Sequence, residues 1–154
     1  MTESQRTYQV GYFVGSLSST SINRILSRAL IRLAPPDLQF TEIPIGDLPL
    51  YNPDHDTDYP PEARALKEAI ARSDAVLFVT PEYNRSIPGA LKNAIDWASR
   101  PWGQNSFHHI PAGVDRRDRD GARPAVPAGS PQLLQRPAAD RTRGLHHVLP
   151  GAVP

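Results

Sequence analysis

In residues 1–107, continuous apolar stretches alternate with segments in which apolar residues recur every three or four positions. Three stretches, 8–15, 38–45 and 74–80, are apolar with little interruption, as expected for strands of a sheet covered on both faces. After each stretch, apolar residues recur at the three- and four-residue spacing of one side of a helix. These helical positions are Ile22, Ile25, Leu26, Ala29, Leu30 and Leu33, then Ala65, Leu66, Ala69 and Ile70, and then Ala90, Leu91, Ala94, Ile95 and Ala98. The pattern predicts the order β-α-β-α-β-α.

Strands that alternate with helices predict a parallel sheet with helices on both faces and right-handed crossovers. Ligands of such sheets bind outside the carboxyl ends of the strands, where the strand order reverses. Two polar loops, 16–21 and 81–88, directly follow predicted strands. We therefore expect the two loops to lie side by side.

The first loop, within "GSLSSTSIN" (15–23), carries four serines and a threonine before a predicted helix. A helix N-terminus attracts anions, and hydroxyl groups add hydrogen-bond donors without charge. The loop has no lysine and matches neither the P-loop nor the dinucleotide fingerprint. Two interpretations stay open, namely a cradle for a monophosphate and a polar turn in which Ser21 caps the helix.

The second loop, "PEYNRSIP" (81–88), places an acid, a phenol, an amide and a guanidinium between two prolines. Prolines reduce the conformational entropy that is lost when a loop is ordered around a ligand. The edge of a planar heterocycle needs donors and acceptors of this kind. The alternative is a capped turn with solvated side chains.

Together, "GSLSSTSIN" and "PEYNRSIPGALKNAIDWASRP" resemble the NADPH-dependent FMN reductase family, the flavodoxin-like quinone, azo and chromate reductases, over residues 8–107. The resemblance implies a three-layer α/β/α fold. It also implies FMN as cofactor, NADPH or NADH as donor, a small-molecule electron acceptor, and a homodimer or homotetramer for intact relatives. The residues it assigns to FMN are Ser16, Ser18, Ser21, Ile22 and Asn23 at the phosphate, Pro81, Glu82, Tyr83 and Asn84 along the ribityl chain and ring, and Arg85 and Ser86 near the ring or a subunit edge.

The amino-acid composition excludes several kinds of site and partner. The chain has no cysteine, which excludes disulfides, thiolate nucleophiles and cysteine-ligated metals. A net charge of +1 gives no reason to expect nucleic acid or a membrane surface as partner. We expect a cytoplasmic protein with no signal peptide, no metal site, and no side chain acting as catalytic acid or base. The acidic loop around His55 is interpreted as solvated, and Trp97 and Trp102 as packing residues.

The composition changes after residue 107. Residues 108–154 contain seven Arg and four Asp but no Lys, Glu or aromatic residue. We therefore divide the chain into residues 1–107, an incomplete flavodoxin-like FMN-binding domain, and residues 108–154, a tail that is disordered or read out of frame. A single-base shift supports the second interpretation. Synonymous codons for residues 134–153 then give "CNAPQLTAPEAYITFYPELF", and "DRRD" (115–118) gives Ile-Gly-Ala-Thr.

A frameshift near residue 107 would end the sheet after its third strand and helix, leaving an apolar edge and weak or absent FMN binding. Two further interpretations stay open beside the reductase. A flavodoxin-type electron carrier would bind FMN without a nicotinamide pocket, although residues 1–107, at a net charge of −2, lack the strong acidity typical of flavodoxins. The other is an inactive remnant of the reductase.

Overall fold

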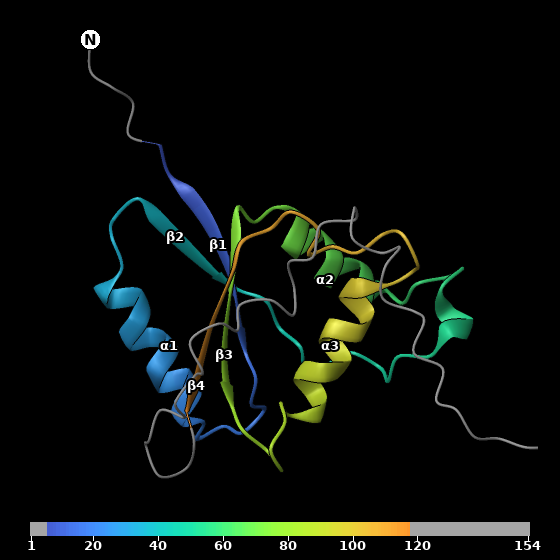
Figure 1. Cartoon of the computed structure of the whole chain (residues 1–154), viewed down its shortest axis with the longest axis horizontal. Helices are drawn as coiled ribbons and strands as arrows, with labels where there is room; N and C mark the ends of the chain where they lie inside the picture. The colour runs from blue at the N-terminus through green and yellow to red at the C-terminus, as the bar shows by residue number, and fades with distance from the viewer. Residues whose placement is uncertain (1–5, 118–154) are drawn as a thin grey trace, which may run out of the picture.

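The computed structural model describes residues 6–117, in which strands and helices alternate along the chain (Figure 1). A short 3-10 helix, Pro53–His55, lies in the loop after the second strand. The strands are β1 (Tyr8–Val14), β2 (Leu38–Glu42), β3 (Ala75–Pro81) and β4 (Ala112–Arg117), and the helices are α1 (Ile22–Leu33), α2 (Pro61–Ala71) and α3 (Gly89–Ser99).

All paired strands are parallel, in the order β2-β1-β3-β4. The chain moves from β1 to one side to form β2 and then to the other side to form β3, so the strand order reverses at the β1–β3 pair. α1 covers one face of the sheet, and α2 and α3 cover the other (Figure 1). The predicted flavodoxin-like three-layer fold is confirmed.

The prediction that the sheet ends with its third strand is wrong. β4 pairs with β3 from Val76, opposite Ala112, to Pro81, opposite Arg117. Strand pairing uses backbone groups, so the short sequence after Pro111 suffices to extend the sheet without a long apolar run. The composition of residues 108–154, taken as a whole, concealed this strand. The prediction of a disordered or out-of-frame tail concerns mainly residues 118–154, which lie outside the described residues.

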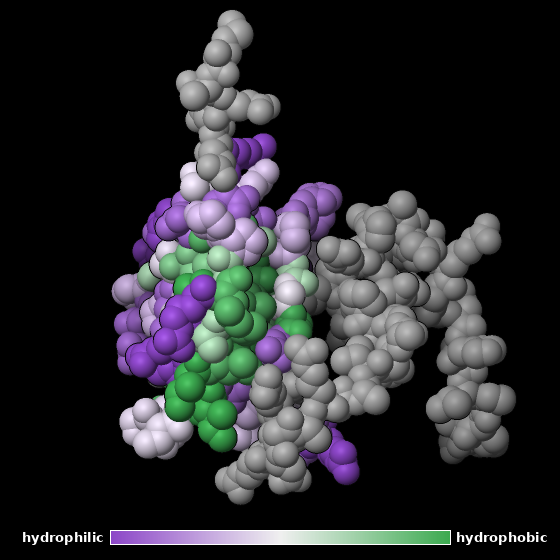
Figure 2. Space-filling model, turned by 90° about the vertical axis from the view of Figure 1, so that its left-hand side faces the viewer, coloured by the Kyte–Doolittle hydropathy of each residue, from purple (hydrophilic) through white to green (hydrophobic). Residues whose placement is uncertain are grey.

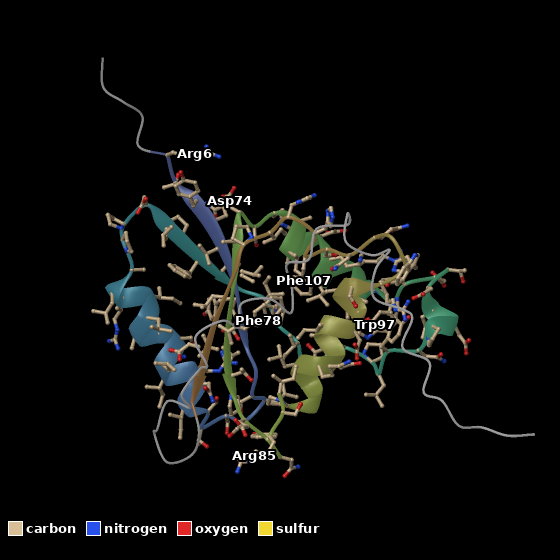
Figure 3. All side chains as sticks on the ribbon, in the orientation of Figure 1. Arg6, Asp74, Phe78, Arg85, Trp97 and Phe107 are labelled. Carbon is tan, nitrogen blue, oxygen red and sulfur yellow. The ribbon has the colours of Figure 1, made fainter. Side chains whose placement is uncertain are left out.

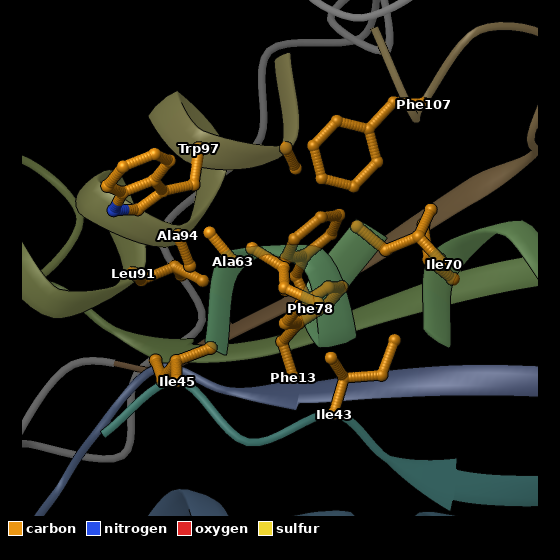
Figure 4. Packing of buried hydrophobic residues seen from close by; sticks show 13 residues of the cluster. Phe13, Ile43, Ile45, Ala63, Ile70, Phe78, Leu91, Ala94, Trp97 and Phe107 are labelled. Atoms are coloured by element: carbon orange, nitrogen blue, oxygen red, sulfur yellow. The ribbon is translucent and has the colours of Figure 1, made fainter. Parts of the chain in front are cut away.

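The main hydrophobic core lies between the sheet and the pair α2 and α3 (Figure 4). The ring of Phe13 in β1 stacks on that of Phe78 in β3, with 4.8 Å between centroids, and Phe107 packs edge-on against Phe13. Trp97, on α3, is fully buried in the same cluster. This layer therefore joins the two central strands to α2 and α3.

The other face differs, because the buried residues of α1 are the polar Asn23 and Ser27. Ser27 Oγ donates a hydrogen bond of 2.9 Å to the Arg24 carbonyl oxygen. The Arg24 guanidinium binds both carboxylate oxygens of Glu42, at 2.8 and 2.7 Å, and so ties α1 to the end of β2. All six of the apolar side chains that predicted this helix are exposed or half-buried.

Replacing Phe13 with Ala should lower the free energy of unfolding by about 3–5 kcal/mol, because the substitution leaves a cavity between β1, β3 and α3. Leu33→Ala is the matched control, since Leu33 is 83% exposed and its loss should change stability by no more than about 0.5 kcal/mol. Urea titrations followed by circular dichroism measure both. Equal losses in the two variants would contradict this assignment of the core.

Candidate functional site

The carboxyl ends of β1 and β3 approach each other closely at Gly15. The Gly15 amide donates to the Val79 carbonyl oxygen at 2.8 Å. A Cβ atom on Gly15 would lie 2.4 Å from Thr80 Oγ1 and 2.7 Å from Thr80 Cβ, closer than atoms pack. Only glycine therefore fits here, and the loops that follow these two strands start side by side, as predicted, at the reversal of strand order.

The serine loop, residues 16–21, is held by its own hydroxyl groups. Ser21 caps α1, since its Oγ accepts from the Arg24 amide at 3.4 Å. Ser18 Oγ accepts from the Thr20 amide at 3.3 Å and lies 3.2 Å from Thr20 Oγ1. Ser16 is buried, whereas Ser18 is exposed. The capping interpretation is confirmed, and the same geometry directs the positive end of the α1 dipole at this loop.

Asn23, in the first turn of α1, carries an unsatisfied polar atom. Its side chain is 7% exposed, and Oδ1 has no hydrogen-bond partner. Leaving a buried acceptor unpaired costs about 1–3 kcal/mol. A ligand hydroxyl at the start of α1 would remove that cost, which fits a phosphorylated sugar-alcohol chain such as that of FMN.

The loop after β3 is a tight turn that projects from the end of the sheet (Figure 3). The Tyr83 amide donates to the Ser86 carbonyl oxygen at 2.8 Å, and the Ser86 amide donates back at 2.9 Å. Between them, Asn84 and Arg85 both have positive φ, at 51° and 64°. Tyr83 is 50% exposed beside the turn, and Pro88 precedes α3. Residues 83–86 thus form a rigid hairpin tip.

Replacing Arg85 with Gly should raise the free energy of unfolding by about 0.5–1 kcal/mol, because a left-handed conformation costs a residue with a side chain about 1–2 kcal/mol and the added flexibility of glycine offsets part of the gain. Asn84→Gly is the matched control and should gain less, because asparagine tolerates positive φ. Thermal melts of the unchanged protein and of the two variants measure these differences in stability. A loss of stability in Arg85→Gly would show that the guanidinium contributes more than its backbone conformation costs.

A third segment, residues 46–52, borders the same end of the sheet, and sequence reasoning missed what holds it. Asn93 Nδ2 and Trp97 Nε1, both on α3, donate to the Pro49 carbonyl oxygen at 2.8 and 2.7 Å. Asn93 Oδ1 accepts from the Tyr51 amide at 2.8 Å. One signal for this role was present in the sequence. Asn93 lies between Leu91 and Ala94, on the side of the helix that the apolar spacing places in the core.

Trp97 is also the centre of an aromatic cluster, so its interpretation as a packing residue is confirmed, whereas Trp102 is 79% exposed. The rings of Tyr51 and Tyr59 meet Trp97 edge-on, each at 5.1 Å. Burial, and then the charge of Asp56, raises the pKa of Tyr59 to about 12. The cluster fixes the loop before α2 to the buried side of α3.

Stability should fall as the pH rises from about 10 to 12. Below pH 10, Tyr59 is protonated in both the folded and the unfolded state, and its contribution is fully present. Between these values the unfolded phenol ionises first, and so the folded state loses stability. In Tyr59→Phe this fall in stability should be shallower. Urea titrations of both proteins at several pH values between 10 and 12 measure the free energy of unfolding, and the difference between the two profiles gives the contribution of Tyr59. Parallel profiles would contradict the raised pKa.

A cavity of about 440 Å³ lies elsewhere, lined by Asp58, Arg64, Lys67 and Gln104 among others. None of the predicted FMN residues lines it. Lys67 Nζ donates to the carbonyl oxygens of Ala98, Arg100 and Gln104, and burial lowers its pKa. These bonds fasten the segment after α3 to α2, so this lysine has a structural role.

Within residues 6–117, no cluster of three or more His, Asp or Glu side chains is arranged to hold a metal ion. In the same range, no helix has the length and apolar content needed to cross a membrane.

Residues 8–116 match the model of the NADPH-dependent FMN reductase family. A 2-hydroxy-1,4-benzoquinone reductase of a Burkholderia species is 53% identical over 106 residues, which cover 69% of this chain and 58% of that protein. A quinone reductase of Pseudomonas putida is 54% identical over 110 residues, covering 71% and 59%. The solved structure of FerB, a flavoenzyme NAD(P)H:(acceptor) oxidoreductase from Paracoccus denitrificans, superposes with a TM-score of 0.69 at 50% identity, covering 72% and 61%.

The chain belongs to the NADPH-dependent FMN reductase family. It spans about three fifths of the length of the three relatives described above. The match extends beyond residue 107 and reaches into β4, as the strand pairing does.

Proposed function

We propose that this protein is an FMN-dependent oxidoreductase that takes electrons from NADPH or NADH and passes them to quinones or similar acceptors, such as free FMN, azo compounds or chromate. The observation that carries the proposal is the meeting of two polar loops at Gly15, beside a helix N-terminus whose buried Asn23 Oδ1 lacks a partner. The names of the relatives, which include quinone reductases and an NAD(P)H-dependent FMN reductase, support the same chemistry.

Each loop has its own task in this proposal. The helix N-terminus with Ser16, Ser18, Ser21 and Asn23 binds the phosphate end of FMN, where Asn23 Oδ1 accepts a hydrogen bond from a hydroxyl of the adjoining chain, and Ile22 packs beside it. No residue from 15 to 21 is cationic, and Arg24 is paired with Glu42, so backbone donors, hydroxyls and the helix dipole supply most of the attraction.

The hairpin tip, with Pro81, Glu82, Tyr83 and Asn84, borders the ribityl chain and the ring, and Arg85 and Ser86 lie near the ring or a subunit edge. The FMN ring supplies the electron-transfer chemistry, so the chain's own residues bind, orient and shield it. A homodimer or homotetramer, a cytoplasmic location and the lack of nucleic-acid or membrane partners stay predictions.

One observation favours a second candidate, an inactive remnant of the reductase. About two fifths of the length of each of these relatives is not covered by this chain. The two loops that are proposed to bind FMN lie within the matched residues, whereas the uncovered part of the relatives has no counterpart there. An electron carrier is the third candidate, and it would bind FMN without reacting quickly with NADPH.

Asn23→Ala should weaken FMN binding by about tenfold, which corresponds to about 1.4 kcal/mol for the loss of one buried hydrogen bond. Ser19→Ala is the matched control, since Ser19 is exposed in the same loop and is not among the predicted FMN residues. Quenching of FMN fluorescence by increasing protein measures the dissociation constant.

Addition of NADPH and a quinone to the FMN-loaded protein then separates the candidates. Rapid bleaching of the flavin followed by quinone reduction supports the reductase, whereas binding without bleaching supports a carrier. No binding of FMN at any protein concentration supports the remnant. Equal affinities in the two variants would remove Asn23 from the site.

A further inference from the structure

An ion pair joins the first turn of α1 to the end of β2, next to the serine loop. Arg24 Nη1 lies 2.8 and 2.7 Å from the two carboxylate oxygens of Glu42. Tyr12 Oη donates to the same carboxylate at 3.3 Å. The side chains of Arg24 and Glu42 are 36% and 33% exposed, so solvent and dissolved ions reach the pair only in part.

Both charges of this pair lie at the end of the sheet where the serine loop begins. The Arg24 amide donates to Ser21 Oγ at 3.4 Å, and Arg24 directly follows Asn23, whose buried Oδ1 has no hydrogen-bond partner. Glu42 is the last residue of β2 and pairs with Tyr12, near the carboxyl end of β1. The pair therefore borders the position that is proposed for the FMN phosphate.

The serine loop supplies no positive charge of its own. No residue from 15 to 21 is cationic, and Arg24 is the nearest Lys or Arg along the chain. A phosphate monoester carries a charge of about −1.5 to −2 at pH 7. Two opposite charges in contact act on a more distant group only as a weak dipole. Glu42 thus decides how much of the Arg24 charge a phosphate in the loop senses.

The same ion pair also ties α1 to β2, which is a structural role. Partly exposed ion pairs contribute little to stability, because solvent screens them and two long side chains lose their freedom. The field of a charge beside an anion site, in contrast, acts on every bound anion. The pair is therefore better suited to set the affinity for a ligand than to hold the fold.

A second cation on this face is placed to act more weakly. Arg28 lies one helical turn after Arg24, farther from the serine loop, and is exposed. Figure 2, which views the side of the molecule that carries α1, shows hydrophilic residues beside an apolar centre. Salt in the solution reaches such exposed charges and screens them over about 8 Å at physiological ionic strength. We therefore expect Arg24 and Glu42 to dominate the field at the loop.

We propose that the Arg24–Glu42 pair sets the affinity of the site for phosphorylated flavins, with Glu42 cancelling the field of Arg24 at the phosphate. Loss of the Glu42 charge then tightens FMN binding, and loss of the Arg24 charge weakens it. Loss of both charges leaves the affinity almost unchanged. Riboflavin, which has the same ring and ribityl chain but no phosphate, is indifferent to all three changes. The inference rests on the proposed function in that FMN is the ligand of the serine loop.

Glu42→Gln should tighten FMN binding about three- to tenfold, and Arg24→Gln should weaken it by a similar factor, because each variant leaves one uncompensated charge near the phosphate. In the double variant the dissociation constant should return to within about twofold of that of the unchanged protein. Titrations with FMN and with riboflavin, followed by flavin fluorescence, measure these constants. The gain in Glu42→Gln should disappear in about 1 M salt, where charges are screened over about 3 Å.

Arg28→Gln and Glu68→Gln are the matched controls. Arg28→Gln removes the same charge from the same helix, one turn farther from the loop, and should change FMN affinity less than Arg24→Gln. Glu68 lies on α2, on the other face of the sheet, and pairs with Arg72 at 3.6 Å. Glu68→Gln therefore breaks an ion pair without changing the field at the loop, and it should leave FMN affinity unchanged.

Equal changes for FMN and riboflavin would overturn the inference, because the pair would then act through the fold. So would a double variant that binds FMN as weakly as Arg24→Gln, since Arg24 would then contact the phosphate directly. If a variant does not fold, the unchanged protein provides the test. A cancelled field predicts similar FMN affinity in low and high salt, and a loss of more than about tenfold between 0.05 and 1 M salt overturns it.

Failure of the proposed function gives a different result. The unchanged protein would then bind neither FMN nor riboflavin, and this inference would fall with it. Binding of both flavins with no effect of the charge changes on FMN overturns the inference alone and leaves the proposed function standing.

Discussion

The close backbone approach of β1 and β3 at Gly15 is the constraint on which the site depends. Any side chain at this position would collide with Thr80, and separation of the two strands would break the hydrogen bond from Gly15 to Val79. Because both strands end there, the serine loop and the hairpin tip are placed together by the sheet itself. The stacked rings of Phe13 and Phe78 hold the same strand pair from within the core. The same pair of strands therefore positions the two loops and forms the centre of the core.

Two buried asparagines illustrate how the structure divides polar groups between architecture and ligand binding. Asn93 satisfies its amide by binding Pro49 and Tyr51, and so it holds the segment after β2 against α3. Asn23 keeps a carbonyl oxygen without a partner at the start of α1. Because an unpaired buried acceptor is energetically costly, Asn93 has a structural role, whereas Asn23 is a candidate ligand contact. Residue type alone does not distinguish them, but the partners of each side chain do.

The first three strands, the three helices and the position of both loops could be predicted from the sequence, because apolar period and turn residues are local properties. The spacing of apolar residues correctly predicted the helix α1 but not its orientation. The spacing does not tell whether the apolar side of the helix packs against the sheet or against another element. β4 was missed because its pairing depends on the free edge of β3 and on only three favourable residues, Ala112 to Val114. The roles of Gly15 and Asn93 depend on contacts with residues far along the chain, which no local pattern contains. The assignment of individual residues to FMN stays a prediction from the family resemblance.

The residues that would bind FMN and the residues that would complete the fold belong to different parts of the chain. Both loops that are predicted to bind FMN lie within residues 16–88, between β1 and α1 and between β3 and α3. The exposed apolar side chains of α1 lie on the outer side of the helix, away from the sheet, whereas Asp115 to Arg117 of β4 pair with Val79 to Pro81 at the same end of the sheet as the two loops. Domains retain only about 5–15 kcal/mol of net stability, so a loss of packing around the sheet mainly reduces the fraction of molecules that are folded. The apparent affinity for a ligand falls by that same fraction, even when the site in each folded molecule is unchanged. Weak FMN binding by this chain would therefore report its folded fraction and would leave the identity of the site intact.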